Sequence, residues 1–90
     1  NGDKPVLVDF FATWCGPCKT MSPIVETVGK EMADQIRVLK VDVDKNQNAA
    51  AQFGIQAVPT FIIFKKGKIV WKQAGGIDKY SLIQQIKQFL

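Results

Sequence analysis

A short apolar run near the start of the chain constrains the fold most strongly. Residues 6–11 read Val-Leu-Val-Asp-Phe-Phe and are apolar at every position except Asp9. An apolar run of this length is typical of a strand that is covered on both faces, as in the centre of an α/β sheet. The sequence therefore predicts a central strand with other elements packed on each side of it.

The rest of the chain alternates helices with strands. Apolar residues recur at helical spacing after the first strand, and Pro23 within that pattern is expected to kink the helix rather than end it. The later segments predict a strand over 36–43, a short helix over 48–53, a strand over 60–64, a tight Lys66-Gly67 turn, a strand over 68–73, and a last helix capped by Asp78.

This order of elements determines the fold class. A strand–helix–strand unit joins parallel strands, whereas the two strands of the closing hairpin must be antiparallel. Ninety residues correspond to one domain, so residues 1–90 are assigned to a single domain. We therefore expect an α/β fold built on a mixed sheet of four strands, with helices on both faces.

Both cysteines of the chain lie in the stretch Trp14-Cys15-Gly16-Pro17-Cys18, where the first strand gives way to the first helix. Side chains three residues apart on a helix have Cβ atoms about 5–6 Å apart. A disulfide requires a Cβ separation of about 3.8 Å. A small tightening of the first helical turn therefore closes the bond, and a small relaxation opens it. The spacing indicates a reversible redox switch rather than a structural crosslink.

The position of Cys15 predicts which thiol is the nucleophile. The free N–H groups and the positive dipole end of the helix begin near Cys15, which favours its thiolate form. Cys18 lies one turn further in, so we expect it to be more buried and less reactive. Pro17 suits the helix start because it has no N–H, and Gly16 lets another backbone approach the sulfur. The prediction is that Cys15 attacks and Cys18 resolves.

Charge and composition exclude several classes of function. With two cysteines and no histidine, the chain cannot supply a four-ligand structural zinc site or a Cys–His catalytic pair. A zinc ion shared by two chains is the remaining metal alternative, and we expect no metal site.

The net charge of +4 includes lysines at 65, 66, 68 and 72, but no arginine cluster or aromatic platform accompanies them. The sequence also contains no run of about 18 apolar residues, which is the length that a membrane-spanning helix needs. Neither nucleic acid nor a membrane is therefore an expected partner.

Several motifs spaced along the whole chain together resemble the thioredoxin family. They are Val8-Asp9-Phe10-Phe11-Ala12, Trp14-Cys15-Gly16-Pro17-Cys18-Lys19, Pro23, Lys40, Val58-Pro59-Thr60, Lys66-Gly67 and Gly75. The resemblance implies a thioredoxin-like fold that lacks the family's first strand and first helix. The strand over 37–43 is then expected to be an exposed edge, with part of one sheet face uncovered. Phe11 stands where the family usually has tryptophan.

The resemblance also implies an activity and partners. It implies a protein-disulfide reductase that receives electrons from a flavoprotein thioredoxin reductase and passes them to protein disulfides. The redox-active Cys15–Cys18 disulfide would need no other cofactor, and the protein would be a cytoplasmic monomer. In the family, the Val58–Pro59 peptide bond is cis and lies beside the reactive sulfur. There the backbone of Val58 pairs with the substrate chain like an added strand.

Asp9 and Lys40 are the other two candidate catalytic residues. From the pattern alone, Asp9 is either a strand-end residue that reaches water or a buried acid. In the family, the matching acid is a buried carboxylate beneath Cys18 that relays its proton, and burial would raise its pKa toward the range of a general base. Lys40 occupies the family position of a lysine paired with this acid, although a solvated strand lysine is an equal alternative.

Trp14 is expected on the surface beside the cysteines, because other aromatic residues suffice to fill the core. A flat apolar patch for protein substrates is then predicted from Trp14, Gly16, Pro17, Val58, Pro59, Ala74 and Gly75. Two alternative functions stay open. One is an oxidase or isomerase domain of an oxidising compartment, and the other is a non-catalytic binding module that uses the patch around Trp14 and Pro59.

Overall fold

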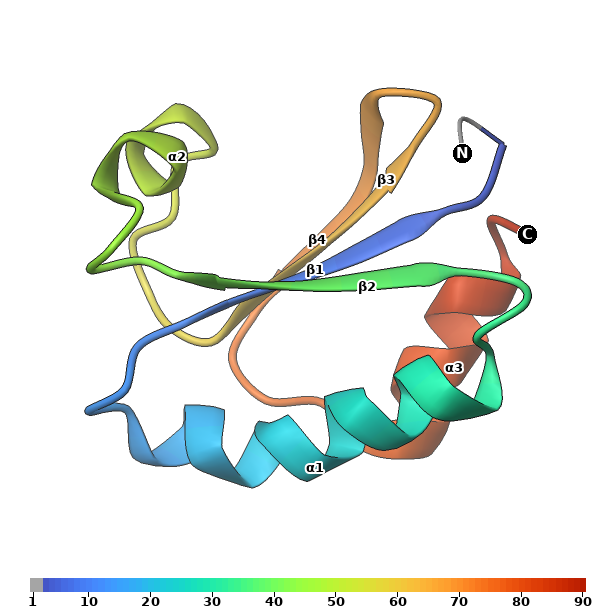
Figure 1. Cartoon of the computed structure of the whole chain (residues 1–90), viewed down its shortest axis with the longest axis horizontal. Coiled ribbons are helices and arrows are strands. Elements are labelled where there is room, and N and C mark those ends of the chain that lie inside the picture. The colour runs from blue at the N-terminus through green and yellow to red at the C-terminus, as the bar shows by residue number, and fades with distance from the viewer. Residues whose placement is uncertain (1–2) are drawn as a thin grey trace.

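Strands and helices alternate along the chain in the computed structural model, which describes residues 3–90 (Figure 1). The elements are β1 (Val6–Phe11), α1 (Gly16–Glu31), β2 (Arg37–Asp42), α2 (Gln47–Gln52), β3 (Thr60–Lys65), β4 (Lys68–Ala74) and α3 (Lys79–Lys87). Each element that the sequence predicts is present, and where bounds were predicted the ends differ by at most one residue. In this part of the chain, no helix is long and apolar enough to cross a membrane.

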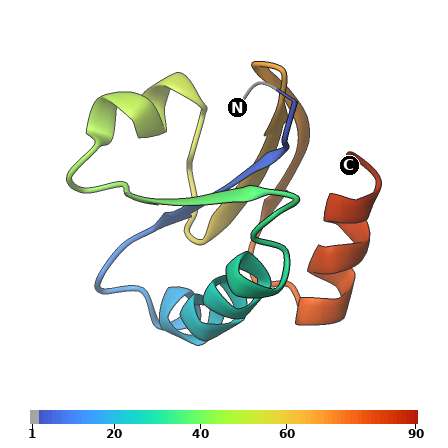
Figure 2. The ribbon, with the colours of Figure 1, turned by 45° about the vertical axis from the view of Figure 1, so that its right-hand side comes forward.

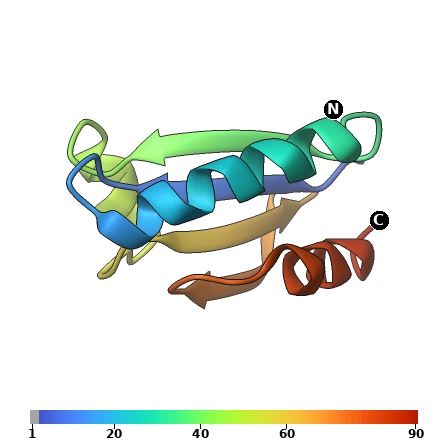
Figure 3. The same ribbon diagram turned by 90° about the horizontal axis from the view of Figure 1, so that it is seen from below.

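The four strands form one mixed sheet in the order β2-β1-β3-β4. β1 pairs in parallel with β2 and antiparallel with β3, and β3 pairs antiparallel with β4. Figure 3 shows the strands side by side in this order, from β2 in green to β4 in orange. The apolar run of β1 thus lies inside the sheet, as predicted, and its residues 7–10 are buried.

Helices α1 and α3 cover one face of the sheet (Figure 2). α1 continues through Pro23, which confirms that this proline does not end the helix. Asp78 caps α3, because its carboxylate accepts a hydrogen bond of 3.1 Å from the Ser81 N–H. The buried side chains between the helices and the sheet form the larger part of the core: Leu7, Met21, Val25, Val28, Met32, Ile36, Phe61, Ile63, Leu82 and Ile86.

The opposite face of the sheet is covered only in part. α2 lies on this side, away from α1 and α3 (Figure 1), and Phe53 and Ile55 after it pack over Phe10 and Ile62. Toward β2 an open hollow of about 380 Å³ remains over apolar side chains that include Val8, Leu39 and Val41. The β2 edge leaves 47% of Leu39 exposed. The expected exposed edge and partly uncovered face are therefore both confirmed.

The turn between β3 and β4 offers a direct test of local stability. Lys66 has a φ of 54° and Gly67 a φ of 79°, which is the pattern of a type I′ turn that asparagine-glycine favours. A left-handed lysine costs about 1 kcal/mol or more. We therefore expect Lys66→Asn to raise the free energy of unfolding in urea by about 0.5–1 kcal/mol. Lys68→Asn, which removes the same charge just outside the turn, should give no such gain. An equal effect at both positions would show that charge, rather than φ, sets the stability.

Candidate active site

Cys15 occupies the position just before α1, and the geometry there matches the expected nucleophile. Its backbone is extended, and the Cys18 N–H donates a hydrogen bond of 3.1 Å to the Cys15 Sγ. Pro17 lies in the first turn, where its missing N–H costs no bond. The sulfur of Cys15 therefore lies at the positive end of a helix of 16 residues.

Cys15 and Cys18 are joined by a disulfide, and their Cα atoms are 5.3 Å apart. Each residue is only 4% exposed, so the expectation that Cys18 is more buried than Cys15 is wrong for this oxidised form. The reason is the loop before β3, which closes over the first cysteine. The carbonyl oxygen of Val58 lies 3.7 Å from the Cys15 Sγ, and Ala12 and Val58 pack around the pair.

The loop that covers Cys15 contains the cis Val58–Pro59 peptide bond that the family resemblance implied. Pro59 itself is buried, and its carbonyl oxygen accepts a hydrogen bond of 2.8 Å from the Gly75 N–H. This contact brings the end of β4 against the loop. Of the other predicted patch residues, Gly16, Pro17 and Ala74 are exposed. These predicted residues lie at the start of α1, in the loop before β3 and at the end of β4, and Pro59 adds no exposed side-chain surface to them.

Trp14 lies on the surface with 69% of its area exposed, so the alternative of a core tryptophan is wrong. Its indole N–H donates a hydrogen bond of 2.9 Å to the Asp44 carboxylate. Trp14 also lines a hollow of about 160 Å³ together with Val43, Ile55 and Val58. Asp44 was not among the site residues predicted from the sequence. Asp44 follows β2, and Trp14 follows the parallel strand β1. Because the carboxyl ends of parallel strands lie at the same edge of a sheet, the position of Asp44 in the sequence could have indicated that it lies near Trp14.

Asp9 is buried in the middle of β1, opposite Lys40 of β2 and Phe61 of β3. It is 1% exposed, so the strand-end interpretation is wrong. Burial raises the pKa of Asp9 from 3.8 to about 6, while the positive charge of Lys40 acts in the opposite direction. Its Oδ1 accepts no hydrogen bond from the residues that the structure describes. This carboxyl group therefore titrates in the range where a general base is useful.

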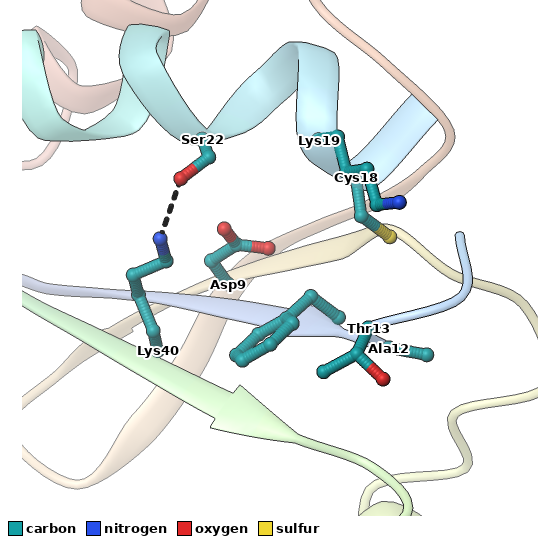
Figure 4. Close-up of a pocket in the computed structure, with 8 residues that line it drawn as sticks. Asp9, Ala12, Thr13, Cys18, Lys19, Ser22 and Lys40 are labelled. Atoms are coloured by element: carbon teal, nitrogen blue, oxygen red, sulfur yellow. Dashed lines mark hydrogen bonds between the residues drawn. The ribbon is translucent and has the colours of Figure 1, made fainter. Parts of the chain in front are cut away.

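Asp9 and Cys18 line the same pocket of about 250 Å³ (Figure 4). In this view the Asp9 carboxyl group points away from β1 toward α1, and Cys18 reaches into the pocket from the first turn of that helix. Phe11 also lines the pocket. The pocket is lined mostly by apolar surface, but Asp9, Ser22 and Lys40 supply polar groups to it, and a space of this size has room for water between them. The arrangement can therefore pass a proton between the Cys18 thiol and the Asp9 carboxylate.

Lys40 does not form an ion pair with Asp9. Its ammonium donates a hydrogen bond of 2.8 Å to the Ser22 Oγ, drawn as the dashed line in Figure 4, and lies 3.7 Å from Glu26 Oε2. It also lies 5.6 Å from the centre of the Phe11 ring. The implied pairing with Asp9 is thus corrected to an interaction at longer range, because side chains of α1 hold the ammonium.

The family model described as Thioredoxin matches residues 1–88. This chain belongs to the thioredoxin family. Among solved structures, a thioredoxin variant from Halobacterium salinarum superposes with a TM-score of 0.91 at 38% identity. The match covers 97% of this chain and 75% of that one. The thioredoxin-like fold inferred from the motifs is therefore confirmed.

Curated thioredoxin-family relatives are similar along most of the chain. A thioredoxin-like protein from Synechocystis sp. is 49% identical over 87 residues, with 97% of this chain and 83% of that protein covered. Thioredoxin from Haemophilus influenzae is 40% identical over 90 residues, and 84% of it is covered. Chloroplastic thioredoxin Y from Oryza sativa subsp. japonica is 49% identical over 90 residues, and the chain spans about half of it, 54%.

Family membership and the cysteine geometry together define the chemistry of this site. Thioredoxin-family proteins of this kind are thiol–disulfide oxidoreductases, and this chain carries the required cysteine pair at a distance that permits a disulfide. The chain is a thiol–disulfide oxidoreductase, and its partners are disulfides.

Proposed function

We propose that this chain is a protein-disulfide reductase that passes two electrons from the Cys15–Cys18 dithiol to disulfides of other proteins. The observation that carries the proposal is the position of the Cys15 sulfur at the start of α1, where it accepts a hydrogen bond from the Cys18 N–H over 3.1 Å. In the reduced protein this position favours the Cys15 thiolate.

The first step is attack of the Cys15 thiolate on one sulfur of the substrate disulfide. A mixed disulfide forms between Cys15 and that sulfur, and the substrate S–S bond breaks. The departing substrate sulfur leaves as a thiolate and takes a proton from solvent. Trp14 and the hollow that it lines with Val43 and Val58 are suited to an apolar side chain of the substrate. The backbone of Val58 is the proposed pairing edge for the substrate chain.

The second step releases the substrate. The Asp9 carboxylate accepts the proton of the Cys18 thiol, through water in their shared pocket. The Cys18 thiolate then attacks the Cys15 Sγ, and the second substrate sulfur leaves as a thiolate and is protonated. The substrate has gained two electrons and two protons, and the Cys15–Cys18 pair is oxidised. A flavoprotein thioredoxin reductase is the proposed source of electrons for the next cycle.

The surroundings of Cys15 support a reductant rather than an oxidant. Its sulfur meets the Cys18 N–H and the Val58 carbonyl oxygen, and Ala12 packs against the cysteine pair. Without a cationic side chain in this set, the helix start is the main source of thiolate stabilisation, so the reduced form is only moderately favoured. A reductase of this kind works as a monomer in a reducing compartment such as the cytoplasm.

The reduction potential of the Cys15–Cys18 couple tests this proposal. We expect equilibration against glutathione buffers to place it near the reference value of thioredoxin itself, about −270 mV, and well below the roughly −120 mV of a strongly oxidising periplasmic relative. The same preparation should catalyse reduction of insulin disulfides. A potential near the oxidising reference would favour an oxidase or isomerase. Binding of protein partners without insulin reduction would favour the non-catalytic binding module.

A further inference from the structure

Three polar side chains form a connected group between β2 and α1, at the edge of the Asp9 pocket. The Lys40 ammonium donates to the Ser22 Oγ over 2.8 Å, and the Ser22 hydroxyl donates to Glu26 Oε2 over 3.4 Å. The Lys40 Nζ lies 3.7 Å from the same Glu26 oxygen. Ser22 and Glu26 are four residues apart on α1, so both present their oxygens to the same cation.

Lys40 is also the cation placed to pair with Asp9. The two residues are register partners on adjacent parallel strands, and such partners project from the same face of a sheet. The Asp9 Oδ1 lacks a hydrogen-bond partner among residues 3–90. A buried carboxylate normally takes such a partner. Figure 4 shows the Lys40 ammonium turned toward Ser22, with the Asp9 carboxyl group beside it.

We propose that Ser22 and Glu26 are positioning residues that hold the Lys40 ammonium against α1 and so keep it from closing on the Asp9 carboxylate. The inference rests on the proposed function, because it concerns how readily Asp9 takes the Cys18 proton. It assigns the two α1 residues no contact with the substrate or with either sulfur.

Among the charged groups around Asp9, the distance from the Lys40 ammonium to the Asp9 carboxylate has the largest influence on the pKa of Asp9. From α1 the groups near the pocket are Lys19, Glu26 and, in the reduced protein, the Cys18 thiol. From β3 the residue opposite Asp9 is the apolar Phe61. The positive charge of Lys40 on β2 lowers the pKa of Asp9. A Lys40 that moved closer would stabilise the carboxylate and make it a weaker base.

Titration of Asp9 in the oxidised protein tests the inference without any turnover. The carboxyl carbon is followed by ¹³C NMR against pH, in a form whose cysteines do not titrate. We expect Ser22→Ala to lower the pKa of Asp9, and the Ser22→Ala/Glu26→Gln double variant to lower it by about one unit. Ser22→Thr retains the hydroxyl and should titrate like the unmodified chain. Thr20→Ala removes an exposed hydroxyl elsewhere on α1 and should have no effect.

A Lys40→Gln background tests whether Ser22 affects Asp9 through the position of Lys40 or by its own direct interaction with the carboxylate. When Lys40→Gln removes the cation, Ser22→Ala should no longer change the titration of Asp9, because the two effects run through the same group. An unchanged pKa in the Ser22→Ala/Glu26→Gln variant would overturn the inference. So would a Ser22→Ala effect of equal size in the Lys40→Gln background.

The outcomes also distinguish this inference from the proposed function. If the chain proves not to reduce protein disulfides, the NMR titration still reports whether Ser22 and Glu26 hold Lys40. If the chain is a reductase, the rate of substrate release should fall at acidic pH as Asp9 becomes protonated. The midpoint of that fall should move to lower pH in the same variants, by the same amount as the pKa of Asp9. If the chain reduces protein disulfides but Ser22→Ala leaves the pKa of Asp9 unchanged, the proposed function stands and this inference is refuted.

Discussion

Replacing Cys18 with serine will convert this chain into a covalent trap for its substrates. Cys15 keeps its place at the start of α1, so its thiolate still attacks a substrate disulfide. The thiol that displaces the substrate is gone, and the mixed disulfide at Cys15 therefore accumulates while turnover falls to the background rate. The adduct is measured by mass spectrometry after incubation with a protein disulfide, and dithiothreitol should reverse it.

Cys15→Ser is the matched control for this trap. Because both cysteines are equally buried, at 4% exposure each, accessibility in the oxidised form does not favour either one. What distinguishes them is that Cys15 lies at the helix start, whereas Cys18 lies within the first turn. Cys15→Ser should therefore show neither turnover nor adduct. Normal turnover of Cys18→Ser, or an adduct on Cys18 in the Cys15→Ser variant, would refute the assigned order of attack.

Much of the fold could be predicted because its determinants are local. The apolar run of β1, the Lys66-Gly67 turn and the Asp78 cap each act within a few residues, and each is present as predicted. The cap of α2 could not be assigned in the same way, because Asp44 and Asn46 both precede this helix and both have side chains that can cap it. Asn46 occupies the cap position without a side-chain cap bond, and its amide instead donates to the Asp42 carbonyl oxygen.

The parts of the site that sequence could not supply depend on contacts between distant segments. Cys15 is as buried as Cys18 because Val58 closes over it from a loop 43 residues away. Trp14 is tied to Asp44 across 30 residues. Spacing within one motif carries no information on either contact. Likewise, the family resemblance implied a pairing of Lys40 with Asp9 but could not show that Ser22 on α1 binds its ammonium.

The ionisation of Asp9 should cost stability in a defined pH window. Burial raises the pKa of Asp9 in the folded chain from 3.8 to about 6. The unfolded chain therefore loses this proton first as the pH rises. The protonated form of Asp9 favours the folded chain, and this contribution to the free energy of unfolding is fully present below pH 3.8. It declines between pH 3.8 and about 6 and is absent at higher pH. The loss is at most about 3 kcal/mol, and less where water in the adjoining pocket screens the carboxylate.

Asp9→Asn removes this ionisation while keeping the size of the side chain. We expect the variant and the unmodified chain to have similar free energies of unfolding near pH 3.5, and the variant to be more stable by up to about 3 kcal/mol at pH 8. Urea titrations at the two pH values measure the difference. A stability gain of the same size at both would show that packing, rather than charge, is responsible.

The same substitution should slow release of the substrate at neutral pH, which ties the stability cost to catalysis. An asparagine cannot accept the Cys18 proton, so the second step should slow by about 10²-fold or more at pH 7. The defect should shrink at alkaline pH, where the Cys18 thiol ionises without a base. Single-turnover decay of the mixed disulfide against pH measures this step. Lys40→Gln keeps the carboxylate and removes the cation that lowers the pKa of Asp9, so it should move the acid limb to higher pH instead. A constant rate defect across the pH range would assign Asp9 a structural role and remove it from the proton transfer.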